Sequence, residues 1–368
     1  MNQTTLSNSP VVSPAFPSVV VGFDGFVDEI AAVVAERTDA RSFRPVQRIA
    51  DFGDMIVAAS GRSFGREFIV SRVEGGGNGP NLAEGLIALG VPVHLYGTLG
   101  QPRQPAFDAI AAQCLSCISI GTGFGKTLAL EFADGKLMLN ETSGLANFDE
   151  SMMHRLIDES GYIKACRESG LIAFANWSRY PHMTACWRAA SRRVLSTLEH
   201  SPWVFVDLAD PSGRKPAEII EMLAVVSSFQ DRCRVVLGMN LSEAGVLQGV
   251  LGNRKPSDDP TSMTEAASSL REHLGVEMVL VHSQRRAAAG WVSPTIKNAA
   301  GSACVEGAFV ANPVRTTGVG DRFNAGVCAG LLSGRTMLES THMGCQAGSW
   351  FVRTGTNISY ANLVSSVS

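Results

Sequence analysis

The sequence predicts an α/β fold in which helices cover both faces of a mainly parallel sheet. From Leu171 onward, short apolar strands alternate with helical runs. This order is typical of parallel sheets, because each crossover helix packs back onto the sheet. The chain has 368 residues and a hydrophobic content of 45%, which suffices for one large domain. The strands expected in this half are 171–175, 203–208, 235–238 and 278–281, with helices such as 215–228 and 261–274.

Composition narrows the class of function. The formal net charge is −3 and the isoelectric point about 6.2, so nothing points to a nucleic acid or membrane partner. No stretch is long and apolar enough for a transmembrane helix. Residues 1–17 are rich in Ser, Thr, Asn and Pro without a basic start, which predicts a disordered tail before a single domain at 18–368. Many of the eight cysteines lie in apolar runs, which suits a cytoplasmic location.

The first strand is expected at residues 18–23, and acidic residues follow it. Asp24 comes directly after the strand and Asp28 four residues later. Open α/β sheets bind ligands beyond the carboxyl ends of their strands. We therefore expect Asp28, and in second place Asp24, to lie at a ligand-binding site. The alternative is that one of them only caps the next segment.

Residues 31–73 have no clear assignment beyond a helical run near 49–59. Within them, Gly61, Ser63 and Gly65 match the Gly-x-Ser-x-Gly elbow of α/β-hydrolases. That motif requires a strand before the serine and a helix after it. Here the preceding residues favour a helix and residues 64–70 favour a strand, so a hydrolase is a minor alternative.

A glycine-rich segment at 74–83 leads into an apolar helix that ends at Gly90. Asn78 and Asn81 can both donate and accept hydrogen bonds, which suits a polyol. The alternative is a loop that caps the helix through Asn81. Further on, residues 127–140 predict a β-hairpin, since an Ala-Asp-Gly turn separates two apolar runs.

Two polar residues follow the strand at 235–238. Asn240 and Glu243 are three residues apart at the start of a helical run. Mg²⁺ retains several waters and takes few protein carboxylates, so one glutamate held by one asparagine could place it. The alternative is a helix cap, in which this spacing is common.

The stretch 315–326 carries the strongest chemical signal. Gly318, Val319 and Gly320 open an apolar helix, so free backbone N–H groups and the helix dipole form an anion site. Asp321 follows in the first turn, where a carboxylate would repel a phosphate. An acid at this place is useful if it takes a proton from a hydroxyl that attacks the phosphate. Positioning and charge stabilisation supply most of such catalysis.

The segments 76–83, 240–243 and 316–326 together resemble the signatures of the ribokinase (PfkB-type) family of carbohydrate kinases, in the family's order over about residues 18–360. The resemblance implies a three-layer αβα sandwich with a small β lid near 120–147, and a possible homodimer formed through that lid. It also implies phosphorylation of a sugar hydroxyl by ATP with Mg²⁺. The implied roles are Asp321 as base, Gly318, Val319 and Gly320 as anion hole, Asp28, Gly77, Asn78 and Asn81 for the acceptor, and Asn240 and Glu243 for the metal, with Glu243 acting through water.

The loop at 282–287 departs from the family pattern. The family usually has Thr-x-Gly-x-x-Gly against the nucleotide phosphates, whereas Gln284 and Ala287 stand where the glycines would be. Ser283, Arg285 and Thr317 are the remaining candidates for nucleotide contacts. A nucleoside kinase of the same fold and a catalytically silent binding protein therefore stay open as alternatives.

Overall fold

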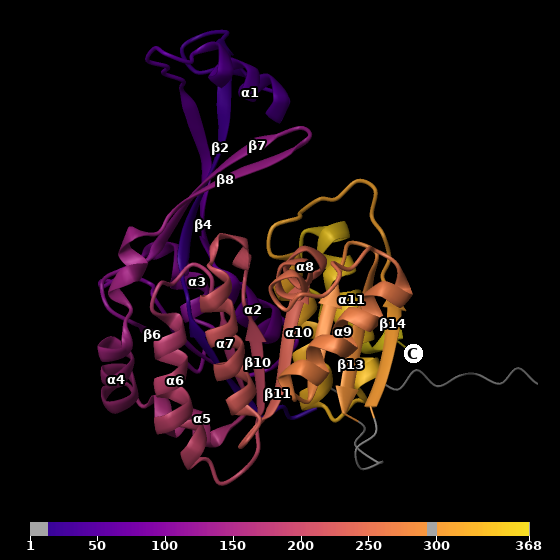
Figure 1. The fold of residues 1–368 in the computed structure, drawn as a ribbon. Helices are drawn as coiled ribbons and strands as arrows, with labels where there is room; N and C mark the ends of the chain where they lie inside the picture. Colours follow the sequence, from indigo (N-terminus) through magenta and orange to yellow (C-terminus); the bar gives the residue numbers. More distant parts are fainter. Residues whose placement is uncertain (1–13, 293–299, 368) are drawn as a thin grey trace, which may run out of the picture.

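The computed structural model describes residues 14–292 and 300–367. A central sheet runs in the order β14-β13-β12-β11-β10-β9-β1-β5-β6 (Figure 1). Seven neighbouring strands are parallel: β6, β5, β1, β9, β10, β11 and β12. Strands β13 and β14 are added antiparallel at the β12 edge. The bounds are β1 (Ser18–Phe23), β5 (Val93–Gly97), β6 (Ser116–Ser119), β9 (Ser169–Ala175), β10 (Trp203–Asp207), β11 (Arg234–Asn240), β12 (Met278–His282), β13 (Arg286–Val292) and β14 (Ala300–Glu306).

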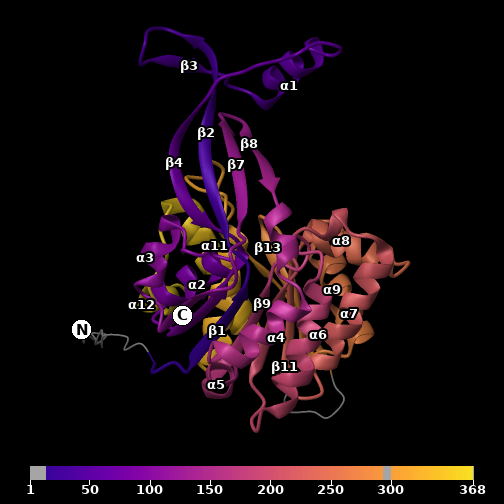
Figure 2. The same ribbon diagram turned by 90° about the vertical axis from the view of Figure 1, so that its left-hand side faces the viewer.

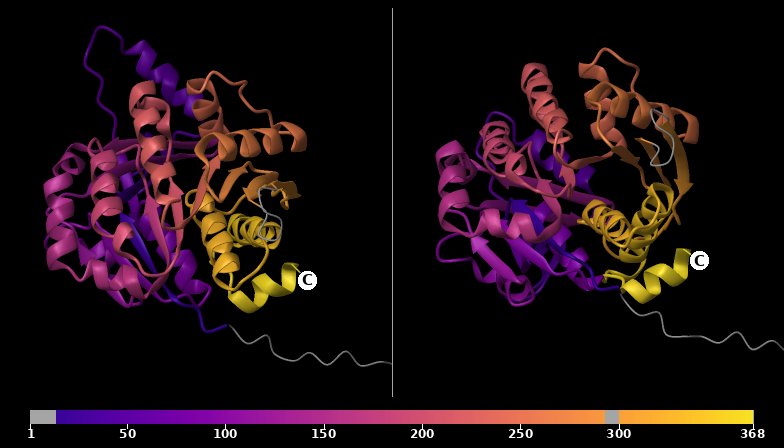
Figure 3. Two further views of the ribbon diagram at one scale, coloured as in Figure 1. Left: turned by 60° about the horizontal axis from the view of Figure 1, so that its bottom comes forward. Right: turned by 90° about the horizontal axis from the view of Figure 1, so that it is seen from below.

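Two hydrophobic cores lie on opposite faces of this sheet and define three layers. In β1, Val20 packs into one core while Val19 and Val21 pack into the other, as strand alternation requires. The first core is covered by α4 (Glu150–Glu159), α5 (Tyr162–Glu168), α6 (Met183–Arg193), α7 (Pro216–Phe229), α8 (Leu241–Val250) and α9 (Pro260–Leu274). The second is covered by α2 (Asn78–Ala88), α3 (Asp108–Ala111), α10 (Val319–Leu332), α11 (Met337–Thr354) and α12 (Tyr360–Val367). Figure 3 shows the yellow C-terminal helices on one side of the molecule and the magenta helices on the other.

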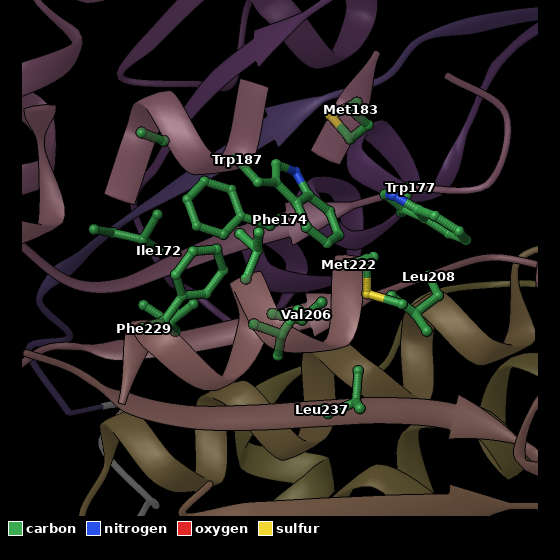
Figure 4. Close-up of a cluster of buried hydrophobic side chains, with 14 of the residues drawn as sticks. Ile172, Phe174, Trp177, Met183, Trp187, Val206, Leu208, Met222, Phe229 and Leu237 are labelled. Atoms are coloured by element: carbon green, nitrogen blue, oxygen red, sulfur yellow. The ribbon is translucent and has the colours of Figure 1, made fainter. Parts of the chain in front are cut away.

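The first core is rich in aromatic side chains. Phe174 contacts Trp187 and Phe229 with ring centroids 5.8 and 5.3 Å apart (Figure 4). Trp177 is fully buried beside them and donates a hydrogen bond from Nε1 to Thr184 Oγ1 at 2.8 Å. Its ring is therefore part of the core.

A second, smaller sheet forms a lid that rises above the central sheet (Figure 2). The predicted hairpin is confirmed, because β7 (Gly125–Phe132) and β8 (Gly135–Glu141) pair antiparallel. The lid also contains the segment 31–73, which the sequence left unassigned. The elements in and around this segment are β2 (Phe26–Arg37), β3 (Phe43–Pro45), α1 (Ile49–Ala58) and β4 (Phe68–Gly76).

The surroundings of Ser63 agree with the prediction. Ser63 follows helix α1 and precedes strand β4, which reverses the order that a nucleophile elbow requires. Most of the predicted tail lies outside the described residues. Its last part is packed, since Phe16 is buried edge-on against Tyr360 with ring centroids 5.2 Å apart. In the part of the chain that is described, no helix has the length and apolarity to cross a membrane.

Candidate active site

Asp321 lies in the first turn of α10 and is only 6% exposed. Gly318 forms the N-cap with φ 82°, a conformation that strongly favours glycine, and no side chain caps the helix. The first backbone N–H groups of α10 therefore have no partner within the helix and can bind an anion. Gly318, Val319 and Gly320 thus have the arrangement expected of an anion hole beside a carboxylate.

Three carboxylates from distant parts of the chain gather at this turn. The amide Nδ2 of Asn78 lies 3.3 Å from Asp321 Oδ1 and 3.4 Å from Asp207 Oδ1. Asn324 Nδ2 donates to Asp207 Oδ2 at 2.6 Å. Asp207 ends β10 and Asp24 directly follows β1, so the cluster sits at the carboxyl edge of the sheet. Ligands of open α/β sheets bind at this edge.

Burial raises the pKa of Asp321 well above its usual value, and the negative charge of Asp207 raises it further. Arg322 acts in the opposite direction and lowers this pKa. Arg322 is itself buried and is held by an ion pair with Glu84. A carboxylate with a raised pKa is a stronger base, which suits the removal of a proton from a hydroxyl.

Asp24 has a structural role in this arrangement. It is fully buried and accepts hydrogen bonds from the backbone N–H of Asn78 at 2.8 Å and of Gly79 at 2.6 Å, and from Asn176 Nδ2 at 2.8 Å. Burial raises the pKa of Asp24 to about 6. A Cβ on Gly77 would lie 2.6 Å from this carboxylate. Asp24 therefore anchors the glycine-rich loop and the start of α2, rather than capping the segment that directly follows it.

Asp28 instead lies on the lid, in a row of polar side chains that face the central sheet. It is paired in register with Glu74 of β4 and Thr127 of β7, and Thr127 is paired with Asn140 of β8. Burial is the main reason that the pKa of Asp28 is raised. The cavity beneath this row is lined by Asp28, Ile30, Arg72, Glu74, Gly75, Asn81, Ala129, Lys136, Met138, Arg315 and Thr317.

Two larger cavities lie on the other side of the α10 turn. One, of about 350 Å³, is lined by residues that include Arg285, Phe309, Thr316 and Val352. The other, of about 660 Å³, is bounded by Asn240, Ser242, Lys255, His282 and Gly320 among others. Val319 lines both. Thr317, which we predicted to contact the nucleotide, lines the cavity beneath the lid, and its neighbour Thr316 lines the 350 Å³ cavity.

Asn240 and Glu243 form a complete capping box at the start of α8. Asn240 Oδ1 accepts from the Glu243 backbone N–H at 3.0 Å, and Glu243 Oε2 accepts from the Asn240 backbone N–H at 2.8 Å. Burial, and then the charge of Asp207, raises the pKa of Glu243. A nearby cation would offset the negative charges of Glu243 and Asp207, so Asn240 and Glu243 fit a hydrated Mg²⁺. No group of three or more acidic, His or Cys side chains suited to a metal occurs among the described residues.

The altered loop at 282–287 is a tight turn between β12 and β13. The backbone N–H of Ser283 donates to the Arg286 carbonyl at 2.8 Å. Arg286 forms an ion pair with Glu306 at 3.3 Å, which makes it structural. Arg285 stacks over Phe309 at 4.2 Å from the ring centroid and lines the 350 Å³ cavity. Arg285 and Ser283 therefore both line the 350 Å³ cavity.

Sequence reasoning missed several residues of this site. Asp207 had a usable signal, because it ends a buried strand on the same edge as Asp24. Glu74 and Lys136 had none, since each reaches the site only through the folding of the lid. Glu74 Oε2 accepts from Arg315 Nη2 at 2.9 Å, and Lys136 Nζ donates to Thr317 Oγ1 at 3.2 Å.

Comparison with known proteins gives a consistent result. The family model of the prokaryotic ketohexokinases matches residues 11–368. A ketohexokinase of Haloferax volcanii is 29% identical over 350 residues, which cover 94% of this chain and 89% of the relative.

Solved structures share the fold at low identity. The ribokinase of Arabidopsis thaliana, complexed with ribose and ATP, has a TM-score of 0.63 at 16% identity and covers 96% of this chain and 99% of its own. A nucleoside kinase of Burkholderia thailandensis in complex with inosine has a TM-score of 0.60 at 14% identity and covers 95% of each chain. The ribokinase-like fold predicted from the sequence is confirmed, and the chain is an ATP-dependent carbohydrate kinase. It belongs to the prokaryotic ketohexokinase family.

Proposed function

We propose that this kinase transfers the γ-phosphoryl group of ATP to a hydroxyl of a ketohexose, with Asp321 as general base. The observation that carries the proposal is the uncapped turn directly before Asp321, which contributes Thr317 to the cavity under the lid and Val319 to both larger cavities. The acceptor would lie beneath the lid and ATP on the other side. The name of the family and of its Haloferax volcanii member supports a ketohexose as acceptor.

Each group then has one task in the transfer. Asp321 takes the proton of the acceptor hydroxyl as its oxygen bonds to the γ-phosphorus, and ADP leaves with the electrons of the broken bond. The free N–H groups of Gly318, Val319 and Gly320 stabilise the charge on the phosphoryl oxygens. Mg²⁺ held near Asn240 and Glu243 would supply charge neutralisation on the phosphates.

The side chains that line the cavity under the lid, which has a volume of only about 20 Å³, favour a sugar over a nucleoside. Its described lining contains charged and amide side chains such as Asp28, Glu74 and Asn81, and none of these lining residues is aromatic. A polyol needs many donors and acceptors, whereas a nucleobase is usually held on flat apolar or aromatic surfaces. An assay that couples ADP release to ketohexoses, aldohexoses, pentoses and nucleosides tests the proposal. Preferred turnover of a nucleoside, or no ADP release with any sugar, would refute it.

Asn81 is proposed to bind the acceptor. Replacing it by alanine should raise the KM for the acceptor by about five- to tenfold, because a hydrogen bond to a neutral hydroxyl is worth on the order of 1 kcal/mol. The KM for ATP should change little. Steady-state kinetics with each substrate varied in turn checks this, and an effect confined to ATP would place Asn81 on the wrong side of the site.

We also propose that two copies associate through the outer face of the lid. Val73, Leu128 and Leu139 lie with Glu29 in one row across the lid strands on the face opposite to Asp28, and Val73 and Leu139 are 53% and 50% exposed. Sedimentation should show a dimer that the double substitution Val73→Asp and Leu139→Asp converts to a monomer. The control Val57→Asp, at a residue 71% exposed on α1, should leave the dimer intact. A monomeric wild type would refute this proposal.

We place the enzyme in the cytoplasm, which supplies ATP and keeps thiols reduced. All eight cysteines are free thiols, and burial raises the pKa of Cys166, Cys186 and Cys345 to about 12. Efficient export of the protein from its natural host in fractionation experiments would contradict this placement.

A further inference from the structure

We propose that Lys136, at the tip of the lid hairpin, is a catalytic residue that contacts the phosphoryl group during transfer. The proposal rests on the phosphoryl transfer proposed above. Lys136 is the second residue of β8, and its Nζ donates to Thr317 Oγ1 at 3.2 Å. Thr317 directly precedes Gly318, the N-cap of the helix that carries Asp321. A lid residue thus places an ammonium group beside the anion hole.

Lys136 also lies next to the acceptor side of the site. It lines the same cavity as Asp28 and Asn81, and its positive charge lowers the pKa of Asp28. The ammonium group therefore stands between the acid proposed to bind the acceptor and the turn proposed to bind the phosphate. A phosphoryl group that passes from nucleotide to acceptor must cross this space.

The ammonium group retains capacity for a further ligand. It has three N–H donors, and the described contacts use one for Thr317 and one for Glu131 at 3.0 Å. Glu131 is shared with Arg72, at 3.2 Å, so its charge is divided between two cations. A neutral hydroxyl is a weak partner for an ammonium group, whereas phosphate oxygens form charge-assisted hydrogen bonds of about twice the strength of neutral ones.

The start of helix α1 holds the hairpin tip in place. The backbone N–H of Ile49 donates to Asp134 Oδ1 at 2.9 Å, and the backbone N–H of Ala133 donates to the Gln47 carbonyl at 2.8 Å. The turn before Lys136 is therefore held by two hydrogen bonds to residues 47–49 of the lid. Such support is what a catalytic side chain needs, because small displacements from the productive geometry are costly.

The chemical benefit is charge stabilisation from the side opposite to the helix. The phosphoryl group in transfer carries negative charge on its equatorial oxygens. The N–H groups of α10 act on one side, and Lys136 would act on the side of the lid. Because Lys136 is part of the lid, the full set of donors exists only when the lid covers the acceptor and excludes water.

The test compares Lys136→Ala with Lys136→Arg and with Arg44→Ala. Arg44 is a lid cation on β3 that pairs with Glu36 away from the cavity, with a side chain 71% exposed. Loss of one oxyanion donor typically costs about 10²- to 10³-fold in kcat. We expect a loss of about 10²-fold for Lys136→Ala, a smaller loss for Lys136→Arg, and none for Arg44→Ala. Added methylammonium should restore part of the Lys136→Ala rate and should not affect the wild type.

A Thr317→Val variant separates this role from a simple latch between lid and core. It removes the hydroxyl that Lys136 contacts and leaves the ammonium charge in place. We expect it to lower kcat by less than tenfold, without rescue by methylammonium. Equal losses in Thr317→Val and Lys136→Ala, or an active wild type with a Lys136→Ala variant within threefold of it, would overturn the proposal. An inactive wild type with every acceptor would instead overturn the proposed function.

Discussion

Replacing Asp321 by asparagine should lower kcat by roughly 10²- to 10⁴-fold, the usual cost of losing a general base. Asparagine keeps the shape of the side chain but cannot take the proton from the acceptor hydroxyl. The affinity for ATP should change little, because the free N–H groups of Gly318 to Gly320 remain. Steady-state kinetics together with nucleotide binding by calorimetry measures both quantities.

The matched control is Glu150→Gln, which changes an exposed acid in the first turn of α4 and should leave kcat unchanged. The pH profile of the wild type gives a second reading. Because burial and Asp207 raise the pKa of Asp321, activity should fall on the acid side at a pH above the usual carboxyl range near 4. A variant Asp321→Asn within a few-fold of the wild type would remove this residue from the mechanism.

Replacing Asp24 by alanine should lower the free energy of unfolding by roughly 3 kcal/mol or more. The change leaves the N–H groups of Asn78 and Gly79 and the amide of Asn176 without their acceptor, and each buried donor without a partner costs about 1–3 kcal/mol. Urea denaturation of the purified variant measures the effect.

Asp28→Ala is the natural comparison, because both acids were candidates for binding the acceptor. Asp28 is on the lid and lines the cavity, so its removal should raise the KM for the acceptor and leave unfolding almost unchanged. If instead Asp24→Ala unfolds like the wild type and loses acceptor affinity, the roles of the two acids are the reverse of those proposed here.

The sequence was most informative where local chemistry and fold coincide. The strand–helix alternation after Leu171 and the turn chemistry of the 127–140 hairpin are local signals, and both match the structure. The glycine turn at the start of α10 was also recognisable, because glycines, an acid and an apolar helix follow each other directly along the chain.

The lid was less predictable, because its strands bury little surface. In β4, Phe68 and Val73 are exposed, and the alternation that marks a half-buried strand is weak. Pairing of β2 with β4 and β7 brings Asp28 together with Glu74 and Thr127 over long sequence separations. Residue spacing along the chain does not reveal such contacts. Lys136 and Glu74 could therefore be recognised as candidate site residues only from the folded structure.

The division of the chain between the two sides of the active site has a consequence for enzyme engineering. The lid consists of two insertions, residues 26–76 and 125–141, whereas the residues around the larger cavities lie at 240–352. Mutant libraries confined to the two insertions should therefore alter acceptor preference and spare nucleotide affinity. A lid grafted from another kinase would have to bring both insertions, because β2 and β7 are neighbours in one sheet.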